Sequence, residues 1–153
     1  MSAVFNLLDG DLPDEDSRPG YVHRRARVAR DLGGDLLGAT LYETPPGETL
    51  WPYHWELGCE EFLVVVSGTP TVRTPEGERH LRSGDVVHFP QGPPGAHQLL
   101  NRSTEPFRVL ICSTKADTAV AGYPDSEKLY VVAPKHGVDV VVRDEPVDYW
   151  DGE

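Results

Sequence analysis

Cysteine is scarce in this sequence, and no long apolar run is present. The only two cysteines, Cys59 and Cys112, lie far apart and form no CxxC pair, so neither a disulfide framework nor a thiolate zinc site is predicted. No apolar run approaches the roughly 18 residues of a membrane-spanning helix, and the first residues lack the basic and apolar regions of a secretory signal. We therefore expect a reduced compartment, the cytoplasm.

Basic side chains are also few. Lysine and arginine number 14 against 25 aspartates and glutamates, which gives a formal net charge of -11. A negative surface repels nucleic-acid backbones and anionic membranes, so neither is expected as a partner. The one basic cluster, at 23–30, is short, and its arginines are expected to be solvated or to pair with Asp31 and Asp35.

Internal repeats and low-complexity segments are absent as well. The chain of 153 residues has the length of one domain with its own core. Its 15 glycines and 14 prolines separate short stretches rich in β-branched and aromatic residues. This pattern predicts an all-β fold with antiparallel strands at 35–42, 51–56, 61–66, 71–74, 78–81, 86–89, 97–100, 107–113, 129–133 and 138–143.

The remaining segments have weaker patterns. Residues 9–19 are acidic and contain prolines, which indicates a surface loop or a disordered arm. Residues 21–32 fit a helix or an extended segment about equally, 115–127 are expected to be irregular, and the last two strands could form a hairpin around 134–137. The expected organisation is a partly irregular N-terminal arm at 1–34, a barrel core at 35–115 and a C-terminal extension at 116–153.

Four polar side chains stand out on the predicted strands. Residues two apart on a strand face the same side, so these four could converge without any helix. An inward carboxylate on the valine-rich strand at 61–66 is costly to bury unless it meets a cation. Imidazole and carboxylate together suit one divalent first-row ion, such as Fe, Mn, Co, Ni or Zn, and the predicted ligands are His54, Glu56, Glu61 and His97.

The segment 45–68 resembles the first motif of the cupin superfamily, with His54 as its first histidine, Glu61 as its glutamate and Gly68 as its closing glycine. The second motif is matched, with two extra residues before the histidine, by Gly84, Asp85, Pro90, Gly92, His97 and Asn101. The resemblance extends over roughly 35–113 and implies a double-stranded β-helix, or jelly-roll barrel, with a metal site. Residues 89–98, 123–126 and 148–153 resemble a group of small bacterial single-domain cupins, which implies a fold more firmly than a substrate.

The departure from the motif is Glu56, because most cupins carry a second histidine there. As a fourth ligand, Glu56 would favour a harder ion of higher coordination. Outside the ligand set, it would leave His54, Glu61 and His97 as a two-histidine, one-carboxylate group with open positions. Glu56 is then the candidate catalytic residue, because a free carboxylate can carry a proton.

Other notable side chains have simpler interpretations. Core packing or a dimer interface explains Trp51 and Phe89 at least as well as a substrate-stacking wall does. By alternation, Tyr53 and Trp55 should face away from His54 and Glu56. The other histidines match no ligand position, with His88 as the reserve candidate, and we expect docking contacts from Tyr123 and residues 148–153 and inert, buried thiols from both cysteines.

Three functions are compatible with these features. The first is a metal-dependent dioxygenase, decarboxylase or isomerase of a small oxygenated metabolite. The second is a non-catalytic protein that binds a metabolite or a metal, and the third is a barrel without metal. Exposed strand edges and aromatic side chains lead us to expect a homodimer, with contributions from Trp55 and the N-terminal arm.

Overall fold

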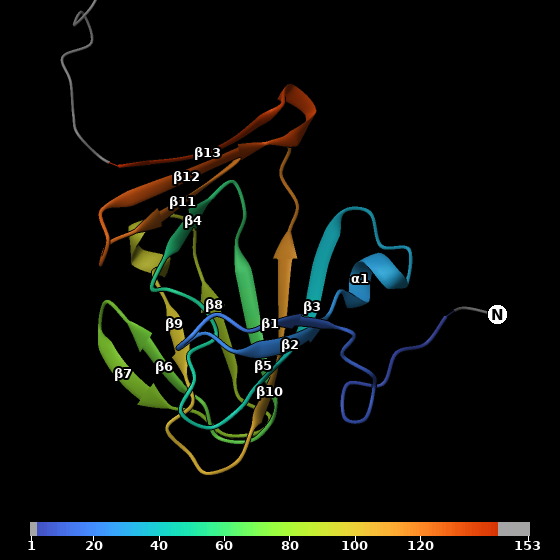
Figure 1. The fold of residues 1–153 in the computed structure, drawn as a ribbon. Helices are drawn as coiled ribbons and strands as arrows, with labels where there is room; N and C mark the ends of the chain where they lie inside the picture. The colour runs from blue at the N-terminus through green and yellow to red at the C-terminus, as the bar shows by residue number, and fades with distance from the viewer. Residues whose placement is uncertain (1–2, 144–153) are drawn as a thin grey trace, which may run out of the picture.

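A computed structural model describes residues 3–143 of the chain, so the interpretation of residues 148–153 lies outside the described part. The described residues form three antiparallel sheets (Figure 1). The six-stranded sheet has the order β1 (Asp14–Asp16), β2 (His23–Ala26), β3 (Leu37–Thr44), β10 (Phe107–Thr114), β5 (Glu61–Ser67) and β8 (Val86–Phe89). The three-stranded sheet consists of β7 (Gly77–His80), β6 (Thr71–Thr74) and β9 (Gln98–Leu100). The four-stranded sheet consists of β13 (Val138–Arg143), β12 (Lys128–Ala133), β11 (Ala119–Tyr123) and β4 (Trp55–Leu57).

The main core lies between the six-stranded and three-stranded sheets. On β5, Leu63 and Val65 are fully buried, and on β10 Val109 pairs with Val65 and is equally buried. Leu99 and Phe107 complete the centre of this core. Burial of each such side chain stabilises the fold by roughly 1.5–3 kcal/mol. The predicted all-β barrel in one domain is confirmed.

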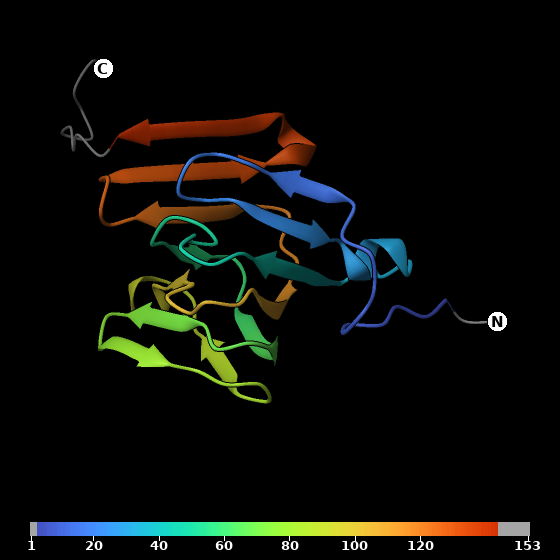
Figure 2. The ribbon, with the colours of Figure 1, turned by 60° about the horizontal axis from the view of Figure 1, so that its bottom comes forward.

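The chain at residues 49–57 crosses from the barrel to the C-terminal sheet. Thr49 pairs with Leu100 and His54 pairs with His97, which extends the three-stranded sheet by isolated bridges. The chain then continues directly into β4, which pairs with β11. In Figure 2 the C-terminal sheet and the β6–β7 hairpin lie at opposite ends of the molecule. The crossing segment therefore connects the barrel core with the sheet that covers one of its ends.

Three segments differ from the sequence-based expectation. The acidic segment 9–19 contains β1, because Asp14 and Glu15 lie opposite Arg25 and Arg24 of β2, and such oppositely charged cross-strand pairs are favourable. The ambiguous segment 21–32 contains β2 and then only a short helix, α1 (Val28–Asp31). The supposedly irregular segment 115–127 contains β11, whose partner β4 is distant in sequence.

Two further expectations concern the C-terminal hairpin and the domain boundaries. The C-terminal strands β12 and β13 form the expected hairpin, joined by a 3-10 turn (Pro134–His136). A second 3-10 turn (Pro93–Gly95) precedes His97. Within residues 3–143, no helix is both long and apolar enough to cross a bilayer. The domain boundaries at residues 34 and 115 stay a prediction.

Candidate metal centre

Three of the four predicted ligands meet at one point. One ligand atom each from His54, Glu61 and His97 can be chosen such that all lie within 4.8 Å of one another. His54 and His97 are held side by side by two backbone hydrogen bonds: each N–H donates to the other's carbonyl, at 3.1 Å and 2.8 Å. Glu61 is the first residue of β5 and lies across from this pair. The barrel thus brings two imidazoles and one carboxylate from three separate segments together.

Both imidazoles have the tautomer that a metal ligand requires. The Nδ1 atom of His54 lies 2.9 Å from the carbonyl oxygen of Pro52, and that of His97 lies 2.9 Å from the carbonyl oxygen of Gly95. A carbonyl oxygen only accepts, so each Nδ1 must carry the proton and donate. The lone pair is therefore on Nε2, and the backbone fixes the orientation of each ring.

The Nε2 atom of His97 is the best evidence that the group suits a cation. It is buried and has no hydrogen-bond partner among the described residues. Its nearest acidic atom is Oε2 of Glu61, at 3.4 Å. A buried polar atom without a partner costs about 1–3 kcal/mol. A metal ion would satisfy this lone pair and the facing carboxylate together, so the residues fit a metal ion of the kind expected.

Burial sets the protonation states of this group. Burial, with His54 beside it, lowers the pKa of His97 to about 3, and burial also lowers the pKa of His54. Both rings are therefore neutral at pH 7 and able to coordinate. Burial, reinforced by the nearby Glu56 carboxylate, raises the pKa of Glu61 to about 8. The carboxyl lacks a counter-charge, which a divalent ion would supply.

Glu56 lies beside the three-residue group. Its Oε1 atom is 3.8 Å from Nε2 of His54, and its side chain is 30 % exposed. Its other oxygen, Oε2, accepts a hydrogen bond of 2.6 Å from the Cys59 thiol. Burial and the neighbouring Glu56 raise the pKa of Cys59, so the thiol stays protonated and donates. Ligation by Glu56 stays a prediction, while the hydrogen bond from Cys59 is a contact that the sequence analysis missed.

A cavity of about 230 Å³ opens over the group. Besides His54, Glu61 and Glu56, its walls include Tyr42 from β3, Trp51, and Tyr123 from β11, while His97 is buried behind them. The Tyr123 ring stacks on His54 at 5.8 Å and 23°. Trp51 meets the His54 and His97 rings edge-on. Trp51 thus lines the cavity, while Tyr42 and Tyr123 are wall residues that sequence reasoning did not identify.

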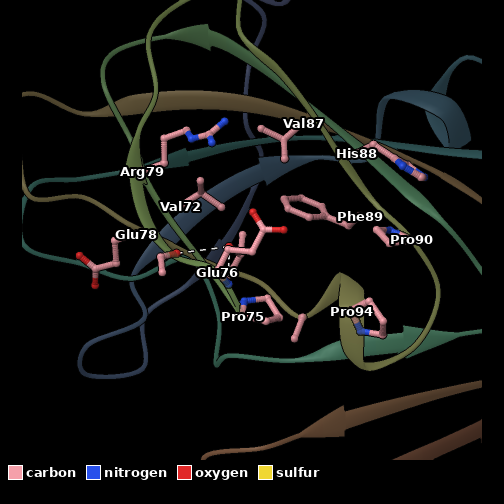
Figure 3. A pocket seen from close by; sticks show the side chains of 13 residues that line it. Val72, Pro75, Glu76, Glu78, Arg79, Val87, His88, Phe89, Pro90 and Pro94 are labelled. Atoms are coloured by element: carbon pink, nitrogen blue, oxygen red, sulfur yellow. Dashed lines mark hydrogen bonds between the residues drawn. The ribbon is translucent and has the colours of Figure 1, made fainter.

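A larger cavity of about 420 Å³ lies between the β6–β7 hairpin and β8 (Figure 3). None of the four predicted ligands lines it. Phe89 lines it, and the Phe89 ring stacks on the His97 ring at 3.7 Å and 4°. This ring therefore supports His97 from the side of the larger cavity.

The remaining predicted residues lie outside the group. His88 is half exposed, with Nε2 3.4 Å from Glu60, so the reserve candidate does not join the ligands. Tyr53 packs under the Arg73 guanidinium at 4.0 Å. The Trp55 ring lies so close to Gly122 that a Cβ there would collide with it. As alternation predicted, neither Tyr53 nor Trp55 lines the cavity over the metal group.

Comparisons with known proteins agree with this geometry. The family model for the cupin domain matches residues 40–113. The search of curated proteins gave no match. A candidate sugar phosphate isomerase of Acidithiobacillus ferrooxidans is 26% identical, with 87% of this chain and 86% of that chain covered and a TM-score of 0.79.

Two further solved structures show similarity of fold alone. A sugar phosphate isomerase of Silicibacter pomeroyi, from a cupin superfamily, is 22% identical, with coverages of 96% of this chain and 98% of that chain and a TM-score of 0.81. A polyketide cyclase of Streptomyces resistomycificus is 20% identical, with coverages of 64% and 68% and a TM-score of 0.53. The barrel and its C-terminal sheet thus recur together in the first of these two.

Proposed function

Because the cupin-domain family model matches residues 40–113, we propose that this chain is a metal-dependent enzyme acting on a small oxygenated metabolite, and that it isomerises a hydroxylated carbonyl compound of the sugar class. The observation that supports this most is one cavity lined by His54 and Glu61, two members of the candidate metal group, and by the partly exposed carboxylate of Glu56. The similarity to the candidate isomerase at 26% identity favours isomerisation over oxygen chemistry.

The candidate ligands and Glu56 have different roles: the ligands would hold the metal ion, and Glu56 transfers a proton. A divalent ion held by His54, Glu61 and His97 would act as a Lewis acid toward a substrate oxygen. Glu56 accepts a proton at Oε1 from the carbon that bears the substrate hydroxyl group and returns it to the former carbonyl carbon, while the proton of that hydroxyl group moves to the former carbonyl oxygen. The Cys59 thiol donates a hydrogen bond of 2.6 Å to Oε2 of Glu56 and so fixes the direction in which Oε1 of Glu56 points. This exchange needs no oxidant, and its atoms balance.

The cavity walls suit a substrate of this class. Tyr42, Trp51 and Tyr123 offer apolar ring surfaces, against which the C–H faces of a sugar can pack. At about 230 Å³ the cavity admits only a small ligand. The Glu56 side chain is 30% exposed, so the carboxylate is open to solvent. An open path to the carboxylate supports catalysis over a sealed storage site.

Exchange of substrate hydrogen with solvent tests this function. The protein is loaded in turn with Fe(II), Mn(II), Co(II), Ni(II) and Zn(II) and incubated with small aldoses and ketoses in D₂O. The proposal expects isomerised product, with deuterium on the carbon next to the carbonyl group. Proton NMR measures both.

Variants assign the roles. Glu56→Gln should lower kcat by about 100-fold or more, the usual size of general-base catalysis, and keep its metal. His97→Ala should lose the metal. Glu60→Gln is the matched control, because Glu60 lies beside His88 and does not line the cavity. If none of the metals gives exchange with any of the sugars, the proposal is contradicted and a non-catalytic metabolite-binding protein is favoured.

A further inference from the structure

A second cavity of about 300 Å³ lies beside the one over the candidate ligands. The two cavities share Tyr42, Trp51 and Pro52 as walls. The second cavity is also lined by β2 and by the segment before it, which contribute the basic residues Arg18 and Arg25. The two cavities are therefore neighbours across these three side chains, and the second cavity has a basic wall.

Strand pairing fixes Arg25 next to the shared wall. Arg25 of β2 lies directly opposite Tyr42 of β3 in the antiparallel register. Directly opposite residues project from the same face of a sheet, with Cβ atoms about 4.5–5.5 Å apart. The His23 ring, two residues earlier on β2, meets the Tyr42 ring edge-on at 5.7 Å. The backbone thus holds Arg25 of the second cavity beside Tyr42, which lines both cavities.

The arginines of this region are only loosely paired. Arg25 and Arg27 share Asp14, at 3.8 Å and 3.5 Å, and Arg18 lies 3.7 Å from Asp16, which also lines the cavity. Three guanidinium groups thus face two carboxylates, and none of these contacts is a side-chain hydrogen bond among the described residues. Elsewhere, Arg73 donates to Asp125 at 2.6 Å and 2.8 Å.

We propose that this second cavity is an anion subsite, in which Arg25, assisted by Arg18, binds the phosphate group of a phosphorylated sugar whose other end reaches His54, Glu61 and His97. The inference rests on the proposed function, whose substrate it narrows from sugars to sugar monophosphates. Guanidinium groups form charge-assisted, bidentate hydrogen bonds with phosphate. The surplus positive charge is local, because the chain as a whole carries -11.

The first test measures binding of inorganic phosphate to the full chain by isothermal titration. The protein is freed of metal by a chelator, so that phosphate cannot bind through an ion. Wild type is expected to bind, Arg25→Gln to bind at least about tenfold more weakly, and Arg18→Gln to be weakened less. Arg79→Gln is the matched control, because Arg79 lines the other large cavity and should leave the dissociation constant within about twofold.

The second test compares ligands on metal-loaded protein. A sugar phosphate should bind at least about tenfold more tightly than the same sugar without phosphate, and Arg25→Gln should remove that advantage. Absence of phosphate binding, or equal binding by wild type and Arg25→Gln, would overturn the subsite. A sugar acid that binds as well as the phosphate would overturn the phosphate assignment.

The two proposals can fail separately. His97→Ala removes a candidate metal ligand but lies outside the second cavity, so it should bind phosphate like wild type. Phosphate binding by metal-free protein that shows no turnover with any metal would contradict the isomerase and support the subsite. Turnover of sugars by a protein that does not bind phosphate would support the isomerase and contradict the subsite.

Discussion

Replacing Glu61 with glutamine should stabilise the metal-free protein, although it removes a candidate metal ligand. Only 13% of the Glu61 side chain is exposed, and its neighbours are the neutral His97 and the acidic Glu56. Burial raises its pKa from the ordinary 4.5 to about 8. The carboxyl group is therefore more easily ionised in the unfolded chain than in the folded one, and this difference opposes folding. Glutamine has nearly the same shape and does not ionise.

The size of the effect depends on pH in a defined direction. Well below pH 4.5 the carboxyl group is protonated in both states and has no effect on stability. As pH rises from 4.5 to about 8, the unfolded chain loses this proton and the folded chain keeps it, so stability falls. At 1.36 kcal/mol per pKa unit, the loss is about 1 kcal/mol at pH 5 and about 4 kcal/mol at pH 8. The advantage of Glu61→Gln should thus grow by about 3 kcal/mol over this interval.

Urea unfolding of chelator-treated protein at pH 5 and pH 8 measures this difference. All other titrating groups are common to the two proteins, so their contributions largely cancel. At pH 5 a divalent ion at 100 times its dissociation constant should reverse the order, because it stabilises the wild type by about 2.7 kcal/mol, which exceeds the advantage of about 1 kcal/mol that Glu61→Gln has at this pH. An advantage of Glu61→Gln that is equal at both pH values would refute the argument that this carboxyl is buried without a counter-charge.

Three further changes test the walls of the site and the assembly. Cys59→Ala should lower kcat by about tenfold, because the hydrogen bond that orients Glu56 is lost. Cys59→Ser should restore most of the rate without a change in metal content. Steady-state kinetics measures both, and equal rates for Cys59→Ala and wild type would exclude the orienting role. Tyr123→Ala should raise KM by about 3-fold to 10-fold, because its ring stacks on His54, and Tyr123→Phe should not; an unchanged KM in Tyr123→Ala would remove this residue from the substrate wall. Val140 is 46% exposed on the edge strand β13, so we expect the chain to form a homodimer that Val140→Lys dissociates; light scattering that shows a wild-type monomer would contradict this.

The parts of the site that could be predicted depend on local features. His54, Glu61 and His97 stand at motif positions on short strands with turns on either side, and alternation along a strand determines which face they share. The same alternation places Leu63 and Val65 in the core. Strand spacing therefore sufficed for the barrel and for the three converging side chains.

The parts that were missed depend on contacts between distant segments. Tyr123 reaches His54 because β11 pairs with β4, and nothing in the sequence around 119–123 indicates that pairing. Tyr42 faces inward because it lies opposite Val109 on β10, which the sequence of β3 alone does not reveal. The bond from Cys59 to Glu56 depends on the turn at Gly58, which has a φ of 95° and lies against the Thr118 carbonyl.

The central claim is that His54, Glu61 and His97 bind one divalent ion. Its most direct test is a crystal structure of the metal-loaded protein, with anomalous scattering recorded at the absorption edge of the ion. The account predicts one anomalous peak, with Nε2 of both histidines and a carboxylate oxygen of Glu61 at about 2.0–2.2 Å, if the ion is zinc. No peak between these three side chains in protein that was crystallised with excess metal, or a peak bound only by other residues, would contradict it.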